Sequence, residues 1–489
     1  MISISVDWTW TWWIVLVLAF DISVRIIAVF IIPRNRRPTA AMAWLLAIYF
    51  IPIIGILLFL LIGNPRLPRK RRKEQESIND AFREASEGLD FGTLRPDAPE
   101  WFEQLVGLNR KLGALPMAGD NGAQIISDYQ GSLDTMAAEI DRATRYVHVE
   151  FYILQSDGAT DGFFAALERA TARGVAVRVL LDHWANRWKP NYHATISRLQ
   201  RMGAEWHLML PVQPLKGKYQ RPDLRNHRKL VVIDGAVGFV GSQNVTDRSY
   251  NLKANLRRGL QWVDLMVRVD GPVVASLSAV FVSDWYGETG EVFAVESDFL
   301  TDAGTGDLDC QIVPSGPGFE YENNLKLFLS LIFGAKKKIV MVSPYFVPDE
   351  GLLLAIQTAC HRGVEVELFV SEEGDQAMVY HAQRSYYEQL LATGVKIWMY
   401  KRPYILHSKS MSIDDEVAVV GSSNMDMRSF GLNLEVTMLV RGAEFVEQLR
   451  TVEDQYRGMS RELTLEEWEQ RPIRSVLLDN LARLTSALQ

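Results

Sequence analysis

The sequence predicts an α/β protein in which two pseudo-repeated domains share one active site, preceded by an N-terminal hairpin of two transmembrane helices. Three observations support this prediction. Two long apolar segments lie before residue 63. The rest of the chain repeats a pattern of strands and helices at an offset of about 190 residues. Each repeat contains one histidine motif, and the two motifs have identical spacing.

Residues 1–65 are expected to anchor the chain in a membrane. Residues 40–62 contain no charged side chain, and a helix of that length rises about 34 Å, enough to span the hydrocarbon core, although Pro52 and Gly55 could kink it. Residues 8–32 are also long enough, although they contain Asp21 and Arg25, which can pair across one helical turn. The competing interpretations are a buried core helix for the second segment and a helix in the membrane interface for the first.

Flanking charges predict the orientation of this hairpin. Three arginines lie between the apolar segments, whereas six Lys and Arg follow the second one, at the start of a charged linker at residues 66–108. The positive-inside rule then places the rest of the chain in the cytoplasm. The basic run at 69–73 is expected to attract anionic lipid headgroups, with a plain solvated linker as the alternative. Tryptophans at residues 8–13 are typical of an interfacial belt, and no Lys or Arg precedes them, which disfavours a cleaved signal peptide.

Charge and cysteine content restrict what the remaining chain can do. Residues 1–73 carry ten Lys and Arg against two Asp, so the net charge of −7 leaves an excess of acidic residues in the rest. This argues against a nucleic-acid ligand, because binding to a phosphate backbone needs patches of Lys and Arg. Cys310 and Cys360 are the only cysteines, which is too few for a disulfide framework or a zinc site and typical of a reducing compartment.

The internal repeat predicts two α/β domains, at residues 109–295 and 296–489, the second with a C-terminal helix. In the first, strand-like RYVHVEFYIL leads through a helical stretch to RGVAVRVLLD, and in the second KKIVMVSPYFV leads similarly to RGVEVELFV. Each is followed by a helix that ends near Gly203 or Gly394 and by a histidine motif. Strands that alternate with helices in this way form βαβ units.

The histidine motifs are the strongest functional signal. They read NHRKLVVIDGAVGFVGSQN and LHSKSMSIDDEVAVVGSSN. The first supplies His227, Lys229, Asp234, Gly241, Ser242 and Asn244, and the second supplies His407, Lys409, Asp414, Gly421, Ser422 and Asn424. A second copy with all six positions matched arises by chance with a probability on the order of one in a hundred thousand.

These residue types suit displacement at a phosphodiester. Residues i and i+2 of a strand point to the same side, so each motif places one imidazole and one ammonium over one site. Lys229 and Lys409 would stabilise the negative charge that develops on the phosphoryl oxygens. Hydrogen bonds to the same oxygens would come from the other polar residues of the motifs, Ser242, Asn244, Ser422 and Asn424. One imidazole would attack phosphorus while the other protonates the leaving alkoxide, and neither a metal nor another cofactor is required.

Four carboxylates accompany the motifs. Asp234 and Asp414 follow each Lys by five residues at the end of a predicted strand, where fixing the turn is as plausible as direct chemistry. Asp264 and Glu435 fall on the next strand of each half. There each could accept a hydrogen bond from an imidazole Nδ1 and fix its tautomer, so we include them among the residues that line the substrate site.

Other polar residues have simpler interpretations. Six histidines outside the motifs are expected to be structural: His148, His183, His193, His207, His361 and His381. A basic run could receive lipid phosphates or form a solvated loop: Lys216, Lys218, Arg221, Arg225 and Arg228.

Twin HxKxxxxD motifs followed by GSxN resemble the phospholipase D superfamily, over roughly residues 110–470. The apolar segment with its basic linker, together with SPYFVPDE and LRNHRKLVVIDG, is similar to the bacterial cardiolipin synthases of that superfamily. The resemblance implies two phospholipase D-like α/β domains. It also implies that a phosphatidyl group passes from one phosphatidylglycerol to a histidine, and then to the glycerol hydroxyl of a second phosphatidylglycerol, with release of glycerol.

The family pattern assigns the active site to His227, Lys229, Asp234, His407, Lys409 and Asp414, and it favours His227 as the nucleophile. The expected partners are phosphatidylglycerol and membrane lipids, without nucleic acid, and the expected location is the bacterial inner membrane with the catalytic domains in the cytoplasm. The oligomeric state stays open, as does the acceptor, which could be phosphatidylglycerol, phosphatidylethanolamine or water. One alternative is a phosphodiesterase that hydrolyses phospholipids or nucleic acid, and the acidic body argues against nucleic acid as its substrate. The other is a noncatalytic membrane scaffold, which the two intact motifs argue against.

Overall fold

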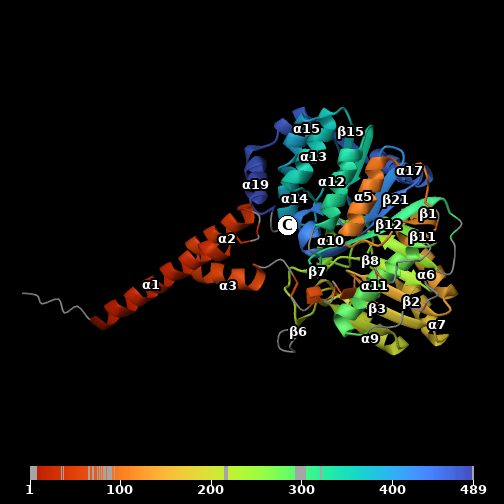
Figure 1. Cartoon of the computed structure of the whole chain (residues 1–489), viewed down its shortest axis with the longest axis horizontal. Helices are drawn as coiled ribbons and strands as arrows, with labels where there is room; N and C mark the ends of the chain where they lie inside the picture. The colour runs from red at the N-terminus through yellow and green to blue at the C-terminus, as the bar shows by residue number, and fades with distance from the viewer. Residues whose placement is uncertain are drawn as a thin grey trace, which may run out of the picture. The chain divides into compact units, whose positions relative to one another are not determined.

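The computed structural model describes residues 8–486 apart from 35, 37, 64–66, 69, 70, 74, 76, 79, 81–83, 85–90, 93, 214–217, 292–303, 305, 320 and 321. The chain separates into two compact units, residues 1–66 and residues 67–489. Figure 1 shows the helices of the first unit in red, while the second unit, which we call the body, runs from orange to blue.

The first unit contains the helices α1 (Trp8–Ile31), α2 (Pro38–Phe50) and α3 (Pro52–Ile62). Residues 12–31 of α1 have a mean hydropathy of 2.6 and form the only helix of the described chain with the length and composition of a membrane span. Within α1, Asp21 and Arg25 form the expected ion pair across one turn, at 2.8 Å.

The expectation that residues 40–62 form one spanning helix is wrong. The helix stops at Phe50 and restarts at Pro52, because proline lacks the N–H that would continue the helix and disfavours helical geometry at the residue before it. The chain bends sharply there, so a Cβ on Gly55 would lie only 2.6 Å from the Ala47 carbonyl oxygen. The two resulting helices, of 13 and 11 residues, are each too short to span a bilayer by themselves.

The N-terminal half of the body alternates strands with helices, as expected. Its elements are α5 (Glu100–Lys111), β1 (Ala118–Ile126), α6 (Tyr129–Arg142), β2 (Tyr146–Phe151), α7 (Asp161–Ala172), β3 (Ala176–Asp182), α8 (His183–Arg187), α9 (Tyr192–Met202), β4 (Glu205–Met209), β5 (Val212–Gln213), β6 (Lys218–Tyr219), β7 (Arg225–Asn226), β8 (Lys229–Ile233), β9 (Val237–Gly241), α10 (Lys253–Arg258), β10 (Gln261–Val263), β11 (Met266–Asp270) and α11 (Val273–Thr289).

The C-terminal half repeats this order. Its elements are β12 (Leu308–Ser315), α12 (Asn323–Gly334), β13 (Lys338–Val342), β14 (Phe346–Val347), α13 (Glu350–His361), β15 (Glu365–Ser371), α14 (Ala377–Arg384), α15 (Tyr387–Ala392), β16 (Lys396–Tyr400), β17 (Tyr404–Leu406), β18 (Ser410–Ile413), β19 (Val417–Gly421), β20 (Met425–Asp426), α16 (Met427–Gly431), β21 (Asn433–Arg441), α17 (Ala443–Gly458), β22 (Ser460–Leu463), α18 (Leu465–Glu469) and α19 (Ile473–Arg483).

Strands of both halves join in one continuous sheet, with the order β22-β16-β15-β13-β18-β19-β21-β12-β1-β11-β9-β8-β2-β3-β4. The halves meet where β1 pairs antiparallel with β12. Outward from that junction each half runs through the same sequence of strands to three parallel strands, β2-β3-β4 in one and β13-β15-β16 in the other, and the C-terminal half adds β22 antiparallel at its edge. The predicted pseudo-repeat is therefore confirmed.

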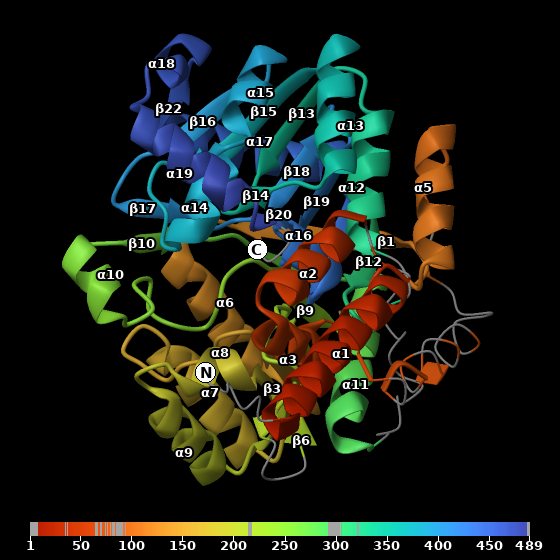
Figure 2. The same ribbon diagram turned by 90° about the vertical axis from the view of Figure 1, so that its left-hand side faces the viewer.

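The core crosses the junction between the halves. One buried apolar cluster combines α11 and β11 of the N-terminal half with β21 and α17 of the C-terminal half. Figure 2 shows the C-terminal half above the N-terminal half, with β1 and β12 between them. Cys310 in β12 and Cys360 in α13 are both free. Because the body packs across the junction, residues from both halves can be held rigidly in one place.

Candidate active site

The two motif histidines are each held by the opposite half of the body. His227 follows β7, which pairs in parallel with β21, and its backbone N–H donates to the Leu434 carbonyl at 2.8 Å. His407 follows β17, which pairs in parallel with β10, and its N–H donates to the Val263 carbonyl at 2.7 Å. These reciprocal pairings bring both motifs into one buried site.

The carboxylate that contacts each histidine also belongs to the opposite half of the body. The Nδ1 atom of His227 lies 3.0 Å from each carboxylate oxygen of Glu435, and the Nδ1 of His407 lies 2.7 Å from Oδ1 of Asp264. The contact of an imidazole with the next carboxylate-bearing strand was expected, but the partner belongs to the other repeat in both cases. An imidazole that donates from Nδ1 to a carboxylate keeps Nε2 for chemistry.

The motif serines hold these carboxylates. The Ser242 hydroxyl donates to Asp264 Oδ1 at 2.7 Å, and the Ser422 hydroxyl donates to Glu435 Oε2 at 2.5 Å. The glycine before each serine allows this approach, because a Cβ on Gly241 would lie 2.3 Å from a backbone oxygen of the carboxylate strand, as it would on Gly421. The expected bonds from serine to phosphoryl oxygens are thus replaced by bonds that orient the carboxylates.

The motif asparagines do not form a matched pair. Asn244 accepts from the N–H of Ile153 at 3.0 Å and donates to the Tyr250 hydroxyl at 2.8 Å, so it is used within the protein. Asn424 is buried, and its Oδ1 has no hydrogen-bond partner among the described residues. That oxygen is an acceptor, so the expected bond from Asn424 to a phosphoryl oxygen would have to come from its amide Nδ2.

Both motif lysines are buried beside the imidazoles. Lys229 donates to the backbone oxygen of His227 at 2.5 Å, and Lys409 donates to that of His407. Burial lowers the pKa of Lys229 to about 7 and that of Lys409 to about 8, although Glu435 and Asp264 oppose the shift. A phosphate that binds here would favour the charged form of both ammonium groups.

The two carboxylates differ in charge. Burial raises the pKa of Glu435 to about 7, against the opposing effect of Lys229. Burial also acts to raise the pKa of Asp264, but His407 and Lys409 outweigh it and hold that pKa at about 2. Asp264 is therefore ionised throughout the neutral range, whereas Glu435 titrates within it.

The two imidazoles differ accordingly. Burial, followed by the charges of Lys229 and Lys409, lowers the pKa of His227 well below its ordinary value of 6.5. Burial also lowers the pKa of His407, but ionised Asp264 opposes that shift. Of the two imidazoles, His407 therefore binds a proton more readily than His227.

Asp234 and Asp414 are not brought together with the imidazoles. The Asp234 carboxylate accepts from the backbone N–H groups of residues 144–146, at 2.7, 2.8 and 2.8 Å. The Asp414 carboxylate does the same for residues 336–338, at 3.0, 2.7 and 2.8 Å. Both residues have positive φ, 53° and 49°, which Asp tolerates better than most residues. Of the two roles that the sequence left open, these bonds favour fixing a turn and the start of a neighbouring strand over direct chemistry.

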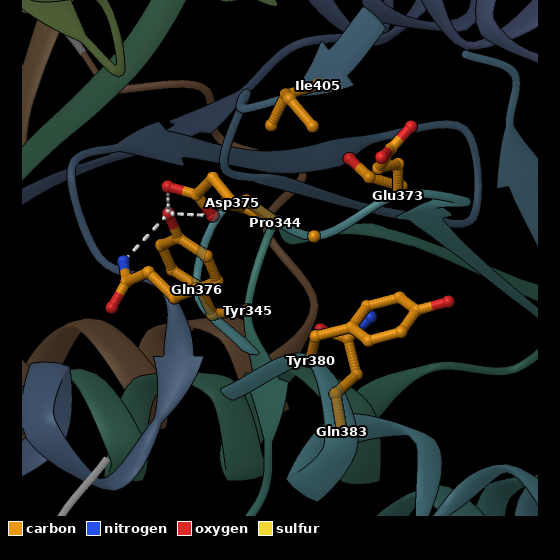
Figure 3. A pocket seen from close by; sticks show the side chains of 10 residues that line it. Pro344, Tyr345, Glu373, Asp375, Gln376, Tyr380, Gln383 and Ile405 are labelled. Carbon is orange, nitrogen blue, oxygen red and sulfur yellow. Dashed lines mark hydrogen bonds between the residues drawn. The ribbon is translucent and has the colours of Figure 1, made fainter. Parts of the chain in front are cut away.

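A pocket beside His407 was missed from the sequence. The ring of Tyr345 lies edge-on to His407 with centroids 6.4 Å apart. The Tyr345 hydroxyl donates to the Asp375 carboxylate, 3.0 and 2.9 Å from its oxygens, and accepts from Gln376 at 3.1 Å (Figure 3). The lining consists of Pro344, Tyr345, Ser371, Glu373, Gly374, Asp375, Gln376, Tyr380, Gln383 and Ile405. An adjoining cavity of about 320 Å³ shares several of these residues.

Tyr152 is the counterpart of Tyr345 in the N-terminal half. Its ring lies 4.8 Å from that of His227, and the Lys229 ammonium lies 5.4 Å from its centroid. The strand register aligns Tyr152 with Pro344, so Tyr345 lies one residue further along its repeat, and aligning the two repeated segments by their strands would not have paired the two tyrosines.

Two of the three arginines in the basic run expected near the site mouth are buried, and Arg221 is half-buried. Arg225 pairs with Asp182 at 3.1 Å, and Arg228 pairs with Asp284. Arg221 pairs with its neighbour Asp223. Lys216 and the side chain of Lys218 lie outside the described residues. The three arginines therefore serve internal ion pairs and do not form a solvated or lipid-binding loop.

Several of the remaining histidines have evident structural contacts. His148 is buried between the stacked rings of Tyr146 and Phe281, and burial lowers its pKa to about 3. His183 accepts from the backbone N–H of Val212 at 3.1 Å. Both lie outside the twin motifs, in agreement with a structural role.

Comparisons with known proteins agree with this geometry. A family described as "Cardiolipin synthase, PLD-like domain" matches residues 136–285 and 328–456, and one described as "Phospholipase D-nuclease N-terminal" matches residues 24–64. The chain is 33% identical to cardiolipin synthase A of Proteus mirabilis, over 93% of this chain and 94% of that one. It is 34% identical to the cardiolipin synthase of Geobacillus kaustophilus, over 95% and 92%. A solved phosphatidylserine synthase of Haemophilus influenzae shares the fold, with a TM-score of 0.60 at 15% identity over 79% of this chain and 100% of that one.

Proposed function

The chain belongs to the cardiolipin synthase family of phospholipase D-like proteins, and on that premise we propose that it condenses two phosphatidylglycerol molecules into cardiolipin and glycerol through a phosphatidyl-histidine intermediate. The observation that carries the proposal is the unequal pair of imidazoles: His407 on ionised Asp264 and His227 on Glu435, facing one site. A two-step transfer needs one neutral imidazole and one protonated imidazole at the same pH.

In the first step, Nε2 of neutral His227 attacks phosphorus and forms a P–N bond. The P–O bond to the headgroup glycerol breaks, and His407 gives its proton to the departing alkoxide. Lys229 and Lys409 face the charge that grows on the two non-bridging oxygens, which is where buried ammonium groups stabilise a transition state most.

In the second step, His407 is neutral and accepts the proton from a headgroup hydroxyl of a second phosphatidylglycerol. The resulting alkoxide oxygen attacks phosphorus, the P–N bond breaks, and His227 is restored. One primary alcohol replaces another of similar acidity, so the transfer needs no external energy source.

The pocket beside His407 suits the headgroup that leaves or enters. The departing and the attacking oxygen must both lie on the side of the histidine that exchanges their proton. Asp375 lines both this pocket and the adjoining cavity of about 320 Å³, where its carboxylate can accept from the hydroxyls of glycerol. An uncharged polyol can therefore be bound without an opposing charge.

The N-terminal unit is also consistent with a lipid substrate. Helix α1 is a candidate membrane span, and phosphatidylglycerol is a bilayer lipid. The excess of Lys and Arg after α3 favours a body on the cytoplasmic side of a bacterial inner membrane.

The experiment that tests this function uses phosphatidylglycerol labelled with ¹³C in the headgroup glycerol as the sole lipid. Full-length protein in detergent should release labelled glycerol and form cardiolipin with a labelled central glycerol, in a ratio of one to one by mass spectrometry. The control is the double variant His227→Ala/His407→Ala, which should form neither product. Release of glycerol with phosphatidic acid as the sole lipid product would identify a hydrolase and contradict the proposal.

A further inference from the structure

Helix α19 at the C-terminal end of the body has a polar inner face. Its residues Ser475, Asp479 and Ala482, with Ser486 just beyond the helix, follow the spacing i, i+4, i+7 and i+11 and share one face. Asp479 is 1% exposed and Ala482 4% exposed, so this face is the one turned toward the body.

Ion pairs fix α19 in this orientation. The Asp479 carboxylate binds Nδ1 of His381 at 2.7 Å and the guanidinium groups of Arg384 and Arg471 at 3.4 and 3.3 Å. Arg384 also donates to the Ser475 hydroxyl at 3.0 Å. Rotation of the helix about its axis would break this network and leave buried charges without partners, which is costly.

The opposite face of α19 is apolar and exposed. It consists of Ile473, Leu477, Leu478, Leu481 and Leu484, whose exposed fractions range from 51% to 81%. An amphipathic helix in a soluble protein normally turns its apolar stripe toward the core. Here the stripe points away from the body, and a contiguous apolar patch of this kind marks a surface of interaction.

We propose that α19 lies in the surface of an anionic bilayer, with this apolar face among the acyl chains and the body above it. Arg474 and Arg483 are exposed on the same helix, and such charges attract anionic headgroups. The candidate span α1 ties the chain to a membrane, so a bilayer is the surface that the body meets at the highest local concentration.

The packing of α19 connects this surface to the headgroup pocket. Helix α14, to which the ion pairs hold α19, supplies Tyr380 and Gln383 to the pocket beside His407 and His381 to the adjoining cavity. Met378 of α14 is exposed as well. Docking of α19 would therefore bring the pocket to the level of the lipid headgroups. This consequence rests on the function proposed above, whereas the docking itself does not.

The test measures the depth of a label on α19 in the full-length protein. Cys360→Ser removes the more accessible native cysteine, and Leu481→Cys then carries an environment-sensitive fluorophore. The matched control carries the same fluorophore at Gln200→Cys, an exposed position of α9. Both proteins are placed in nanodiscs of phosphatidylglycerol and phosphatidylcholine that hold one copy each.

The label at residue 481 should fluoresce at shorter wavelength than the control, should be quenched by lipids brominated on their acyl chains, and should be protected from iodide. Equal quenching by iodide at residues 481 and 200, without quenching by brominated lipids, would overturn the proposal. So would a blue shift that is seen only when a nanodisc holds two copies, because a second chain would then cover the stripe.

A kinetic experiment separates docking of α19 on the bilayer from the catalytic reaction. The variant Leu477→Ser/Leu481→Ser should turn over phosphatidylglycerol in bilayers at least tenfold more slowly but keep the wild-type rate on short-chain lipid dispersed in detergent. Leu354→Ser, on the exposed face of α13, should change neither rate. An equal loss on both substrates, or no loss on bilayers, would count against docking. If the wild-type protein forms no cardiolipin, the proposed function fails, while the label still decides the place of α19.

Discussion

Glu435 binds a histidine from the opposite half of the chain: each of its carboxylate oxygens lies 3.0 Å from Nδ1 of His227. Asp264 has the same relationship to His407 at 2.7 Å. Each half of the body thus contributes one imidazole and the carboxylate that orients the other imidazole. Neither half contains a complete pair, so the catalytic arrangement exists only when both halves are folded against each other.

The first prediction concerns Asp264. Ionised Asp264 stabilises the imidazolium of His407, and Asp264→Asn removes that charge while keeping the shape. Turnover should fall about 100-fold or more. Because the pKa of His407 falls when the anion is lost, the decline of kcat at alkaline pH should move to lower pH. A kcat profile between pH 5 and 9 measures both effects. Asp270→Asn at the end of β11 is the control. An unshifted profile in Asp264→Asn would refute the assignment of His407 as the acid.

Much of this arrangement could be predicted from the sequence, because the repeated spacing of His227 and His407 reports a repeated strand and turn. The spacing could not show that Asp264 and Glu435 exchange partners, since that depends on short strand pairs between residues far apart in the chain. Nor could it separate the role of Asp234 from that of the imidazoles. A repeated motif contains residues that react and residues that hold the turn, and only their hydrogen bonds tell them apart.

The second prediction concerns the lysines. Burial holds the pKa of Lys229 at about 7 and that of Lys409 at about 8, so each ammonium loses its proton as the pH rises through that range. Rates at limiting substrate should therefore decline above about pH 7, because Lys229 is the first of the two to lose its proton. Lys229→Met should lower kcat about 100-fold or more, because the ammonium matters most as charge develops in the transition state. Lys253→Met, on α10, is the control. A kcat in Lys229→Met equal to that of the wild type would remove Lys229 from the mechanism.

The third prediction separates Asp234 from catalysis. Asp234→Ala should lower the free energy of unfolding by about 1–3 kcal/mol, because three backbone N–H groups lose their acceptor, while kcat of the folded protein stays within about twofold. Thermal unfolding and initial rates in detergent measure the two quantities. The exposed residue Asp161 provides the control variant Asp161→Ala. A loss of kcat without loss of stability would return Asp234 to the reacting groups.

The stabilisation by Asp234 also has a pH dependence. Burial acts to raise its pKa, but the bonds from residues 144–146 outweigh burial and hold the pKa below the ordinary value of 3.8. A carboxyl whose pKa is depressed by folding stabilises the protein fully above its unfolded pKa and loses that contribution as the pH falls through the folded value. The stability difference between wild type and Asp234→Ala should thus be constant above about pH 5 and shrink below pH 4.

The fourth prediction concerns the headgroup pocket. Asp375→Asn should raise KM for phosphatidylglycerol about tenfold with a smaller change in kcat, since a hydrogen bond from a substrate hydroxyl to a charged acceptor is weakened. Glu467→Gln, at an exposed position, is the control. Tyr345→Phe tests whether Asp375 acts on the substrate or only on Tyr345. This variant frees the Asp375 carboxylate for the substrate, so its KM should lie nearer to the wild-type value than that of Asp375→Asn. If Asp375→Asn leaves KM unchanged, the headgroup binds elsewhere.

The last prediction concerns which histidine carries the phosphatidyl group. Both His227→Ala and His407→Ala should be nearly inactive on phosphatidylglycerol, but for different reasons. A nitrophenolate leaving group needs no proton, so a lipid with a nitrophenyl headgroup should still phosphatidylate His227 in His407→Ala. Without His407 as base, hydrolysis or transfer from that adduct is slow and the adduct accumulates. Digestion and peptide mass spectrometry should find the added mass on the peptide that contains His227, together with a burst of one nitrophenol per chain.

The reciprocal variant, His227→Ala, tests which of the two histidines is the nucleophile. In His227→Ala the remaining imidazole is His407, which ionised Asp264 keeps more readily protonated and therefore less nucleophilic than His227. No adduct and no burst should form. Because the two motifs are identical in spacing, this difference in carboxylate partners is the physical basis for choosing between them. An adduct on His407 in His227→Ala, with none on His227 in His407→Ala, would reverse the roles of the two histidines.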